Sequence, residues 1–414
     1  MTSATASASR PLRQDAFVIG MIGLAHSVSH FGQLLLPPLF PWLKTAFGVG
    51  YAELGALMTV FFVMSCAVQA LSGFVVDRHG ALPVLFSGLL LIGVAVLGLA
   101  ASQQYWQLTL CAALAGAGNG VFHPVDFTLM NRLVSENRLG HAYSVHGITG
   151  TIGWAVAPAL VVPLAMVGSW RTALVCAAVV VFAITAAVWA ARARLTPTPL
   201  SAPARSARAG APVRAEHPLA FLRLPAVWVC FVFFLFYSGS MSGVQSFAPE
   251  AARQLHGIAA GVAAACITVY MVCAGCGMVL GGFLVQDPAR CERIIAAGMG
   301  LAALAALALA LAPLPTAAVP VLFGVMGFLV GTAGPSRDLI VKQAAPENAT
   351  GRVYGVVYSG LDTGMALAPL LYGFLLDHHR PAAVWLSIAC VQGLLIFTAL
   401  QVRGARRTSV PAMA

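Results

Sequence analysis

Charged residues are scarce in this sequence. Only 9% of its 414 residues are Asp, Glu, Lys or Arg, whereas 59% are hydrophobic. Soluble domains carry about 25% charged residues, and so small a share cannot cover a water-facing surface. Uncharged runs of the length that crosses a bilayer, about 20 residues per helix, recur along the chain. The composition therefore excludes a soluble globular protein and predicts a helical polytopic membrane protein.

Several signatures of chemistry are also missing. The sequence has no glycine-rich phosphate-binding loop, which excludes an ATP-driven mechanism built on that motif. It has no nucleophile–base set or multi-carboxylate metal set on one membrane edge, and no appended soluble domain, which argues against an integral-membrane enzyme or a membrane sensor. The nine cysteines give no disulfide framework. Cys273 and Cys276 lie among glycines that fit helix packing better than metal or redox chemistry. No cofactor is expected.

The hydropathy pattern predicts an all-α fold of twelve membrane helices in two bundles. The expected spans are residues 16–43, 53–76, 80–101, 105–130, 142–167, 170–191, 225–248, 258–285, 292–312, 317–341, 353–376 and 382–402. They group into six-helix bundles at 16–191 and 225–402. A cytoplasmic linker rich in proline and arginine, 192–224, joins the bundles, and short cytoplasmic tails occupy 1–15 and 403–414.

The positive charges predict the orientation in the membrane. An even number of spans puts both termini on one side. All but four of the 23 Lys and Arg residues fall on that side, the exceptions being Lys44, Arg171, Arg253 and Arg380. The positive-inside rule therefore places both termini in the cytoplasm. The net charge of +10 follows from this bias and does not indicate nucleic-acid binding.

The two halves of the sequence resemble each other. At the offset of 211 residues that separates Pro124 from Pro335, the segments 122–158 and 333–369 align without a gap. Internal repeats of this kind are typical of secondary transporters that rock about a central site. The mismatches are informative as well. Asp126 falls opposite Arg337, and Asp362 falls opposite a threonine.

Three motifs carry a resemblance to a known family. The segment from Gly73 to Gly80, with Asp77 and Arg78 between them, resembles the loop motif of the major facilitator superfamily. The stretch from Gly147 to Pro158 resembles the glycine–proline motif of the fifth span in antiporters of that superfamily. Histidines with nearby prolines on spans one and four resemble its fosmidomycin-resistance-type branch, although this chain lacks the acidic residue of that branch on span one.

The resemblance implies that spans one, four, seven and ten line a central chamber. The residues expected to bind substrate there are His26, His30, Gln33, Asn119, His123, Tyr237, Gln245 and Arg337. His26 and His30 share one helix face, as metal ligands can. No Asp, Glu or Cys completes a site in the sequence, so we expect no metal and interpret the histidines as neutral hydrogen-bonding groups that can carry protons.

Gating and coupling residues are predicted from charge and packing. Asp77 is placed to cap a neighbouring helix beside Arg78, whereas Gly147, Gly150, Gly153 and Pro158 form a small-residue face for tight or sliding contact.

Two further predictions concern buried charges. Asp126 and Arg337 are expected to pair when the cytoplasmic mouth is closed. Asp362, close to mid-membrane, and His123 are expected to carry the coupling proton. His146 is interpreted as a packing or gating histidine.

These features predict a secondary transporter of the inner membrane. The favoured function is proton-coupled export of a small organic compound by a monomer embedded in the lipid bilayer. Uptake of a small organic anion by proton symport or exchange, with Arg337 as the carboxylate anchor, is the alternative.

Overall fold

The computed structural model describes residues 11–196, 225–284, 290–344 and 350–409, which form helices and turns without a strand in those ranges. Twelve of the helical segments found there are long and apolar enough to cross a membrane. The predicted all-α fold with twelve spans is therefore confirmed. Most of the expected linker, and parts of both expected tails, lie outside the described residues, so these domain bounds stay predictions.

The first half contains most of the shorter helical elements. Its elements are α1 (Leu12–Gln33), η1 (Pro37–Leu39), α2 (Phe40–Phe47), α3 (Tyr51–His79), α4 (Ala81–Ala101), α5 (Tyr105–Asn119), α6 (Phe122–Leu133), η2 (Glu136–Arg138), α7 (Leu139–Val167), α8 (Trp170–Ala190) and α9 (Arg192–Leu195). The second half has α10 (Pro225–Ser246), α11 (Ala248–His256), α12 (Ala260–Leu284), α13 (Cys291–Leu311), α14 (Ala318–Ala344), α15 (Thr350–Asp377) and α16 (Pro381–Ser409).

Two spans expected as single helices are broken. The first divides into α1, η1 and α2, because Pro37 and Pro38 cannot donate the backbone hydrogen bonds that would continue α1. The fourth divides into α5 and α6 at Gly120. Pro124 cannot donate to the Gly120 carbonyl, which instead accepts from the Ser72 hydroxyl at 3.5 Å. The break places His123 and Asp126 in the first turns of a new helix, α6.

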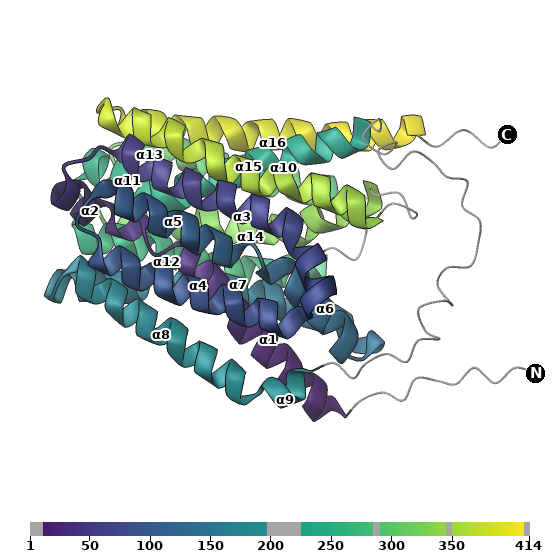
Figure 1. Cartoon of the computed structure of the whole chain (residues 1–414). Coiled ribbons are helices and arrows are strands. Elements are labelled where there is room, and N and C mark those ends of the chain that lie inside the picture. Colours follow the sequence, from purple (N-terminus) through teal and green to yellow (C-terminus); the bar gives the residue numbers. More distant parts are fainter. Residues whose placement is uncertain (1–10, 197–224, 285–289, 345–349, 410–414) are drawn as a thin grey trace, which may run out of the picture.

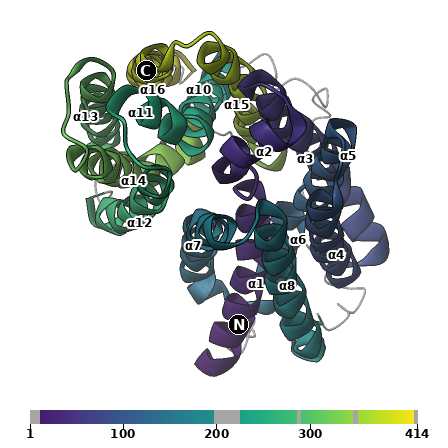
Figure 2. The same ribbon diagram turned by 90° about the vertical axis from the view of Figure 1, so that its left-hand side faces the viewer.

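The helices form two bundles that meet along a shared interface. Figure 1 shows the start of α1 and the end of α16 at the same end of the molecule, here named the terminal side, with α2 and α11 at the opposite end, here named the far side. Viewed from the far side, α1 to α8 gather in one bundle and α10 to α16 in the other (Figure 2). Helices α3 and α15 pack together across the interface, as do α7 and α12.

The two halves are tied together from the far side to the middle of the membrane. The Asp377 carboxylate accepts hydrogen bonds from the Tyr51 and Ala52 amides, at 2.7 and 2.8 Å. Deeper in, the Thr59 hydroxyl donates to the Ala366 carbonyl at 2.6 Å. Further along α3 toward the terminal side, Gln69 Nε2 donates to Asp362 Oδ2 at 3.2 Å. The structure therefore shows the conformation that is closed at the far side.

An ion pair supports this closure. In α11, which lies between two spans, both Glu250 carboxylate oxygens accept from Arg253 at 2.8 Å. Burial raises the pKa of Glu250, but hydrogen bonds from Arg253, Gln254 and Tyr51 outweigh it and hold that pKa below its ordinary value. Because Tyr51 belongs to the first half, the ionised Glu250 contributes to the contact between the halves.

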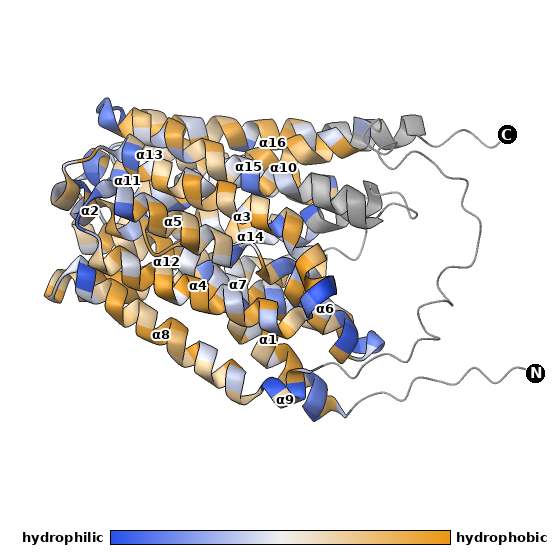
Figure 3. Cartoon of the chain, in the orientation of Figure 1, coloured by the Kyte–Doolittle hydropathy of each residue, from blue (hydrophilic) through white to orange (hydrophobic). Residues whose placement is uncertain are grey.

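Apolar side chains cover the lipid-facing perimeter. Large apolar residues are exposed along α4 and α8, among them Leu90, Val94 and Val179, and Figure 3 shows the orange bands that they form between the more polar ends. Large apolar side chains also fill the core of the second half, where the Phe323 ring packs edge-on against the Trp385 ring. An apolar perimeter of this kind is what a protein dissolved in lipid requires.

Candidate functional site

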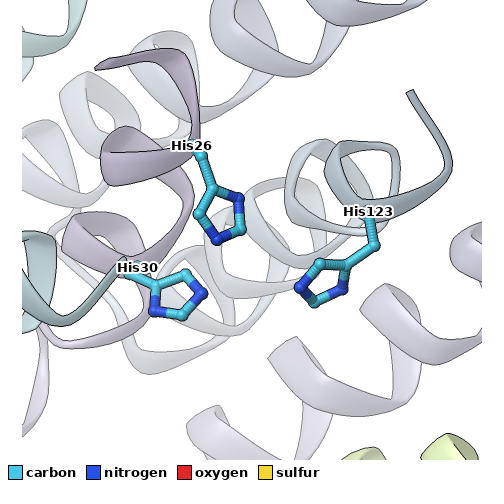
Figure 4. Close-up of side chains that lie close together, drawn as sticks. All are labelled: His26, His30 and His123. Carbon is cyan, nitrogen blue, oxygen red and sulfur yellow. The ribbon is translucent and has the colours of Figure 1, made fainter. Parts of the chain in front are cut away.

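A cluster of histidines lies in the middle of the first half. His26 and His30 come from α1, and His123 from the start of α6. The His26 ring centroid is 4.6 Å from that of His30 and 5.5 Å from that of His123. Figure 4 shows one ring nitrogen of each pointing toward the space between the three rings. His26 is buried, whereas His123 is exposed, so the cluster reaches the surface of the first half.

The buried carboxylate of Asp126 accepts hydrogen bonds from two histidines. His26 Nδ1–H and His146 Nε2–H both donate to Asp126 Oδ2, at 3.0 and 3.1 Å. The His26 and His146 rings stack with centroids 3.5 Å apart. Asp126 is fully buried and its Oδ1 has no hydrogen-bond partner among the described residues. In this conformation Asp126 is thus engaged by histidines, and its pairing with Arg337 stays a prediction for the opposite state.

Gln69 connects the cluster to the second half. Its Oε1 accepts from His123 Nδ1–H at 3.0 Å, and its Nε2 donates to Asp362 Oδ2 at 3.2 Å. One amide therefore joins the two residues expected to carry protons. Gln69 was not among the sequence candidates, since nothing in the sequence distinguishes this glutamine on α3.

Asn119 is occupied by helix packing. Its Oδ1 accepts from Ser29 at 2.6 Å and from Gln33 at 3.1 Å, and its Nδ2 donates to Ser65 at 2.8 Å. Gln33 Oε1 accepts from the Trp154 indole at 3.0 Å. Two predicted substrate-binding residues are thus brought beside the histidines, where they also join α1, α3, α5 and α7.

The remaining predicted binding residues lie on the second half, in two separate places. The Arg337 guanidinium lies 4.3 Å from the Tyr237 ring centroid and 5.7 Å from that of Phe234. Together they make a cationic and aromatic contact between α10 and α14, in which Phe234 is fully buried. Gln245 lies elsewhere, buried in a small cavity at the far side that Pro158 and Glu250 also line. In this conformation Gln245 is apart from the histidines.

The glycine motif of α7 packs against α1. A β-carbon on Gly150 would lie 2.7 Å from the His30 ring, and one on Gly153 would meet the Ser27 carbonyl. Gly147 faces open space. The close approach of α7 to α1 thus positions His30. At the terminal end of α3, Asp77 and Arg78 are exposed and form no hydrogen bond or ion pair within the described part of the chain, so the capping prediction stays untested.

His146 was interpreted from the sequence as a packing or gating residue, and the structure adds it to the polar cluster. A signal was available, because His146 lies one helical turn before Gly150, on the face of α7 that meets α1. The assembled groups are neutral imidazoles, amides and one buried carboxylate. Such a set can bind a polar molecule, pass protons, or ligate a metal ion, because imidazole nitrogens donate, accept and coordinate.

Comparisons with known proteins agree with this architecture. The Major Facilitator Superfamily profile matches residues 22–369. The fosmidomycin resistance protein of Escherichia coli is 28% identical over 165 residues, which cover 38% of this chain and 39% of that protein. An uncharacterised transporter of Bacillus subtilis, YfnC, is 27% identical over 179 residues, or 42% and 43% of the two chains. These matches span less than half of the length of either relative.

Solved structures share the fold over nearly the whole chain. A bacterial homologue of the human lysosomal transporter Spinster, in an inward-facing and occupied conformation, superposes with a TM-score of 0.72 at 15% identity, covering 97% of this chain and 98% of that one. The nucleoside transporter NupG superposes with a TM-score of 0.73 at 13% identity, covering 93% and 99%. With its twelve spans, its two bundles and its profile match, the chain belongs to the Major Facilitator Superfamily and is a multi-pass membrane transporter, not an enzyme.

Proposed function

We propose that this protein exports a small organic compound across the inner membrane in exchange for protons. The name of the Escherichia coli relative, a fosmidomycin resistance protein, favours export. The distribution of positive charge supports a cytoplasmic location for the terminal side. The conformation closed at the far side is then the one that loads substrate from the cytoplasm. The transporter acts as a monomer, with no nucleic acid or cofactor involved.

The contact between Asp362 and Gln69 carries the coupling proposal. It lies near mid-membrane on the interface of the two halves, and it joins α15 to α3 by one hydrogen bond of 3.2 Å. An ionised carboxylate at such a depth is costly unless it keeps polar partners, whereas a protonated one is much less so. The protonation state of Asp362 is therefore linked to whether the halves touch at this point, which is what coupling by alternating access requires.

Asp362→Asn tests the proposal, because asparagine keeps an acceptor for Gln69 but cannot exchange a proton. In proteoliposomes we expect the variant to lose accumulation driven by a pH gradient and to retain substrate exchange without a gradient. Glu136→Gln is the matched control, since Glu136 is an exposed carboxylate of η2. Gradient-driven accumulation at the native rate in Asp362→Asn would exclude Asp362 from coupling.

Uptake of an organic anion remains the second candidate, because Arg337 lies against Tyr237 and Phe234 on the second half. A guanidinium can bind a carboxylate in bidentate fashion, which a lysine cannot reproduce. Arg337→Lys should then weaken the binding of organic acids and leave the binding of uncharged compounds unchanged. The direction of transport is measured in vesicles of known protein orientation, with the pH gradient imposed first in one direction and then in the other.

A further inference from the structure

Two imidazole nitrogens are left without protons at the centre of the histidine cluster, and a nitrogen of His30 faces them. His26 uses Nδ1–H for Asp126 and His123 uses Nδ1–H for Gln69, and both acceptors are side-chain oxygens. A neutral imidazole carries one N–H, so Nε2 of each ring keeps its lone pair. His30 turns its Nδ1 toward Gly150, where that nitrogen has no hydrogen-bond partner within the described ranges, and its other nitrogen faces the two neighbouring rings (Figure 4).

We propose that His26, His30 and His123 bind a divalent transition-metal ion, with one coordination position open to the chamber. One nitrogen of each ring can be chosen so that all three lie within 4.8 Å of one another. Zinc with ligands at about 2.0–2.1 Å in tetrahedral geometry needs nitrogens roughly 3.4 Å apart, so small side-chain rotations complete the site. Three neutral imidazoles select zinc, copper, nickel or cobalt over magnesium and calcium, which take oxygen ligands.

The surroundings match those of known histidine–metal sites. A metal-bound histidine almost always donates its other N–H to a carboxylate or carbonyl, which fixes the ring and the tautomer. Asp126 accepts this hydrogen bond from His26, and Gln69 accepts it from His123, at 3.0 Å in both cases. Asp126 also places a carboxylate directly behind a dication in the low-dielectric interior, where such a charge would otherwise be costly. Its unpartnered, buried Oδ1 adds to this negative environment.

A second set of possible ligands, His26, Asp126 and His146, is the weaker candidate. All three are buried, so this set offers no position that opens to the chamber. Its nitrogens already donate to Asp126, and metal binding would replace both of those hydrogen bonds. The exposed His123 gives the first set a position that solvent can reach. The open position accepts water when a bare ion binds, or a donor atom of a transported chelate; the latter role rests on the transport function proposed above.

Binding is tested without transport. The full chain is purified in detergent through a tag without histidines, and Co²⁺ is added while its visible absorption and its X-ray absorption are recorded. We expect the strong bands of a low-coordinate site and a first shell of three imidazole nitrogens in the native protein. An octahedral, water-rich Co²⁺ spectrum would overturn the proposal, and this readout does not depend on the folding of any variant.

Variants then assign the ligands by competition with Zn²⁺. His30→Gln and His123→Gln should each weaken Zn²⁺ binding at least tenfold, and Asp126→Asn should weaken it about 10–100-fold, as expected for an outer-sphere partner. His141→Gln, which alters an exposed histidine of α7, is the control and should bind as the native protein does. Loss of binding in His146→Gln together with native affinity in His123→Gln would overturn the assignment in favour of the buried set.

Proteoliposomes loaded with radioactive Zn²⁺, either alone or with equimolar nitrilotriacetate, distinguish the two sources of the ion. Release of the bare ion identifies the metal itself as cargo, and release only with the chelator identifies a chelate; both outcomes support the site. Binding of Zn²⁺ to the protein without release of the bare ion or of the chelate also supports the site, and it would show that the metal is not transported. If Asp362→Asn does not alter coupling, the proposed transport function is contradicted, but the metal-site proposal is not affected.

Discussion

Removal of the Asp377 side chain should open the far side of the transporter. This carboxylate, at the end of α15, caps the first turn of α3 by accepting from the Tyr51 and Ala52 amides, and its Oδ1 lies 3.7 Å from Lys44 Nζ. Loss of a helix cap costs about 0.5–2 kcal/mol. Because this cap comes from the opposite half, the whole loss falls on the closed conformation. Asp377→Ala should therefore raise the open population about twofold to thirtyfold.

The assay measures access to the closed cavity. Ala263 lines the cavity and is buried, so a cysteine placed there, with the nine native cysteines replaced, reacts with an impermeant maleimide only when the far side opens. The labelling rate then reports the open population. Glu53→Ala is the matched control, because Glu53 caps Gly50 at the same end of α3 from within the same half. An unchanged rate in Asp377→Ala, or an equal increase in Glu53→Ala, would refute the reasoning.

Three further perturbations have defined outcomes. Gly153→Ala should lower the melting temperature through a loss of about 1–3 kcal/mol, since its β-carbon meets the α1 main chain, whereas Gly147→Ala should not. Asn119→Ala breaks three interhelical hydrogen bonds worth about 0.6 kcal/mol each, so thermal unfolding should show a loss of about 2 kcal/mol; native stability with reduced substrate affinity would instead assign Asn119 to binding. The lowered pKa of Glu250 means that its contribution is complete above its ordinary pKa and is lost as the pH falls through the lowered value. Far-side labelling, corrected for thiolate fraction, should thus stay flat from about pH 8 to 5 and rise only below about pH 4 in the native protein, with no such acid step in Glu250→Gln.

The sequence was sufficient for the fold because the lipid solvent imposes long apolar helices, and these are visible in composition alone. The breaks at Pro37 and Gly120 were harder to foresee. Proline inside a membrane helix is often tolerated, as Pro158 in α7 shows, and only local packing decides whether the helix kinks or ends.

The sequence identified unusual residues of the candidate site but not the contacts between them. Burial cost identified Asp126 and Asp362 as unusual, since a charge in lipid needs a reason. Their partners could not be identified, because His146 and Gln69 are ordinary residues until helix rotation brings them into contact. The repeat suggested Arg337 as the partner of Asp126, yet a symmetry argument describes positions that match, and side-chain contacts depend on which conformation the halves adopt.

The contacts that close the far side, here called ties, affect which residues can be substituted during evolution. In three of them a side chain from one half bonds to a main-chain group of the other: Asp377 to the amides of Tyr51 and Ala52, Thr59 to the carbonyl of Ala366, and Thr268 to that of Ala155. Main-chain groups are the same whatever residue occupies the position. Only one member of each of these three ties restricts the amino acid used. The residues opposite these anchors can therefore change while the main-chain contacts between the halves are kept.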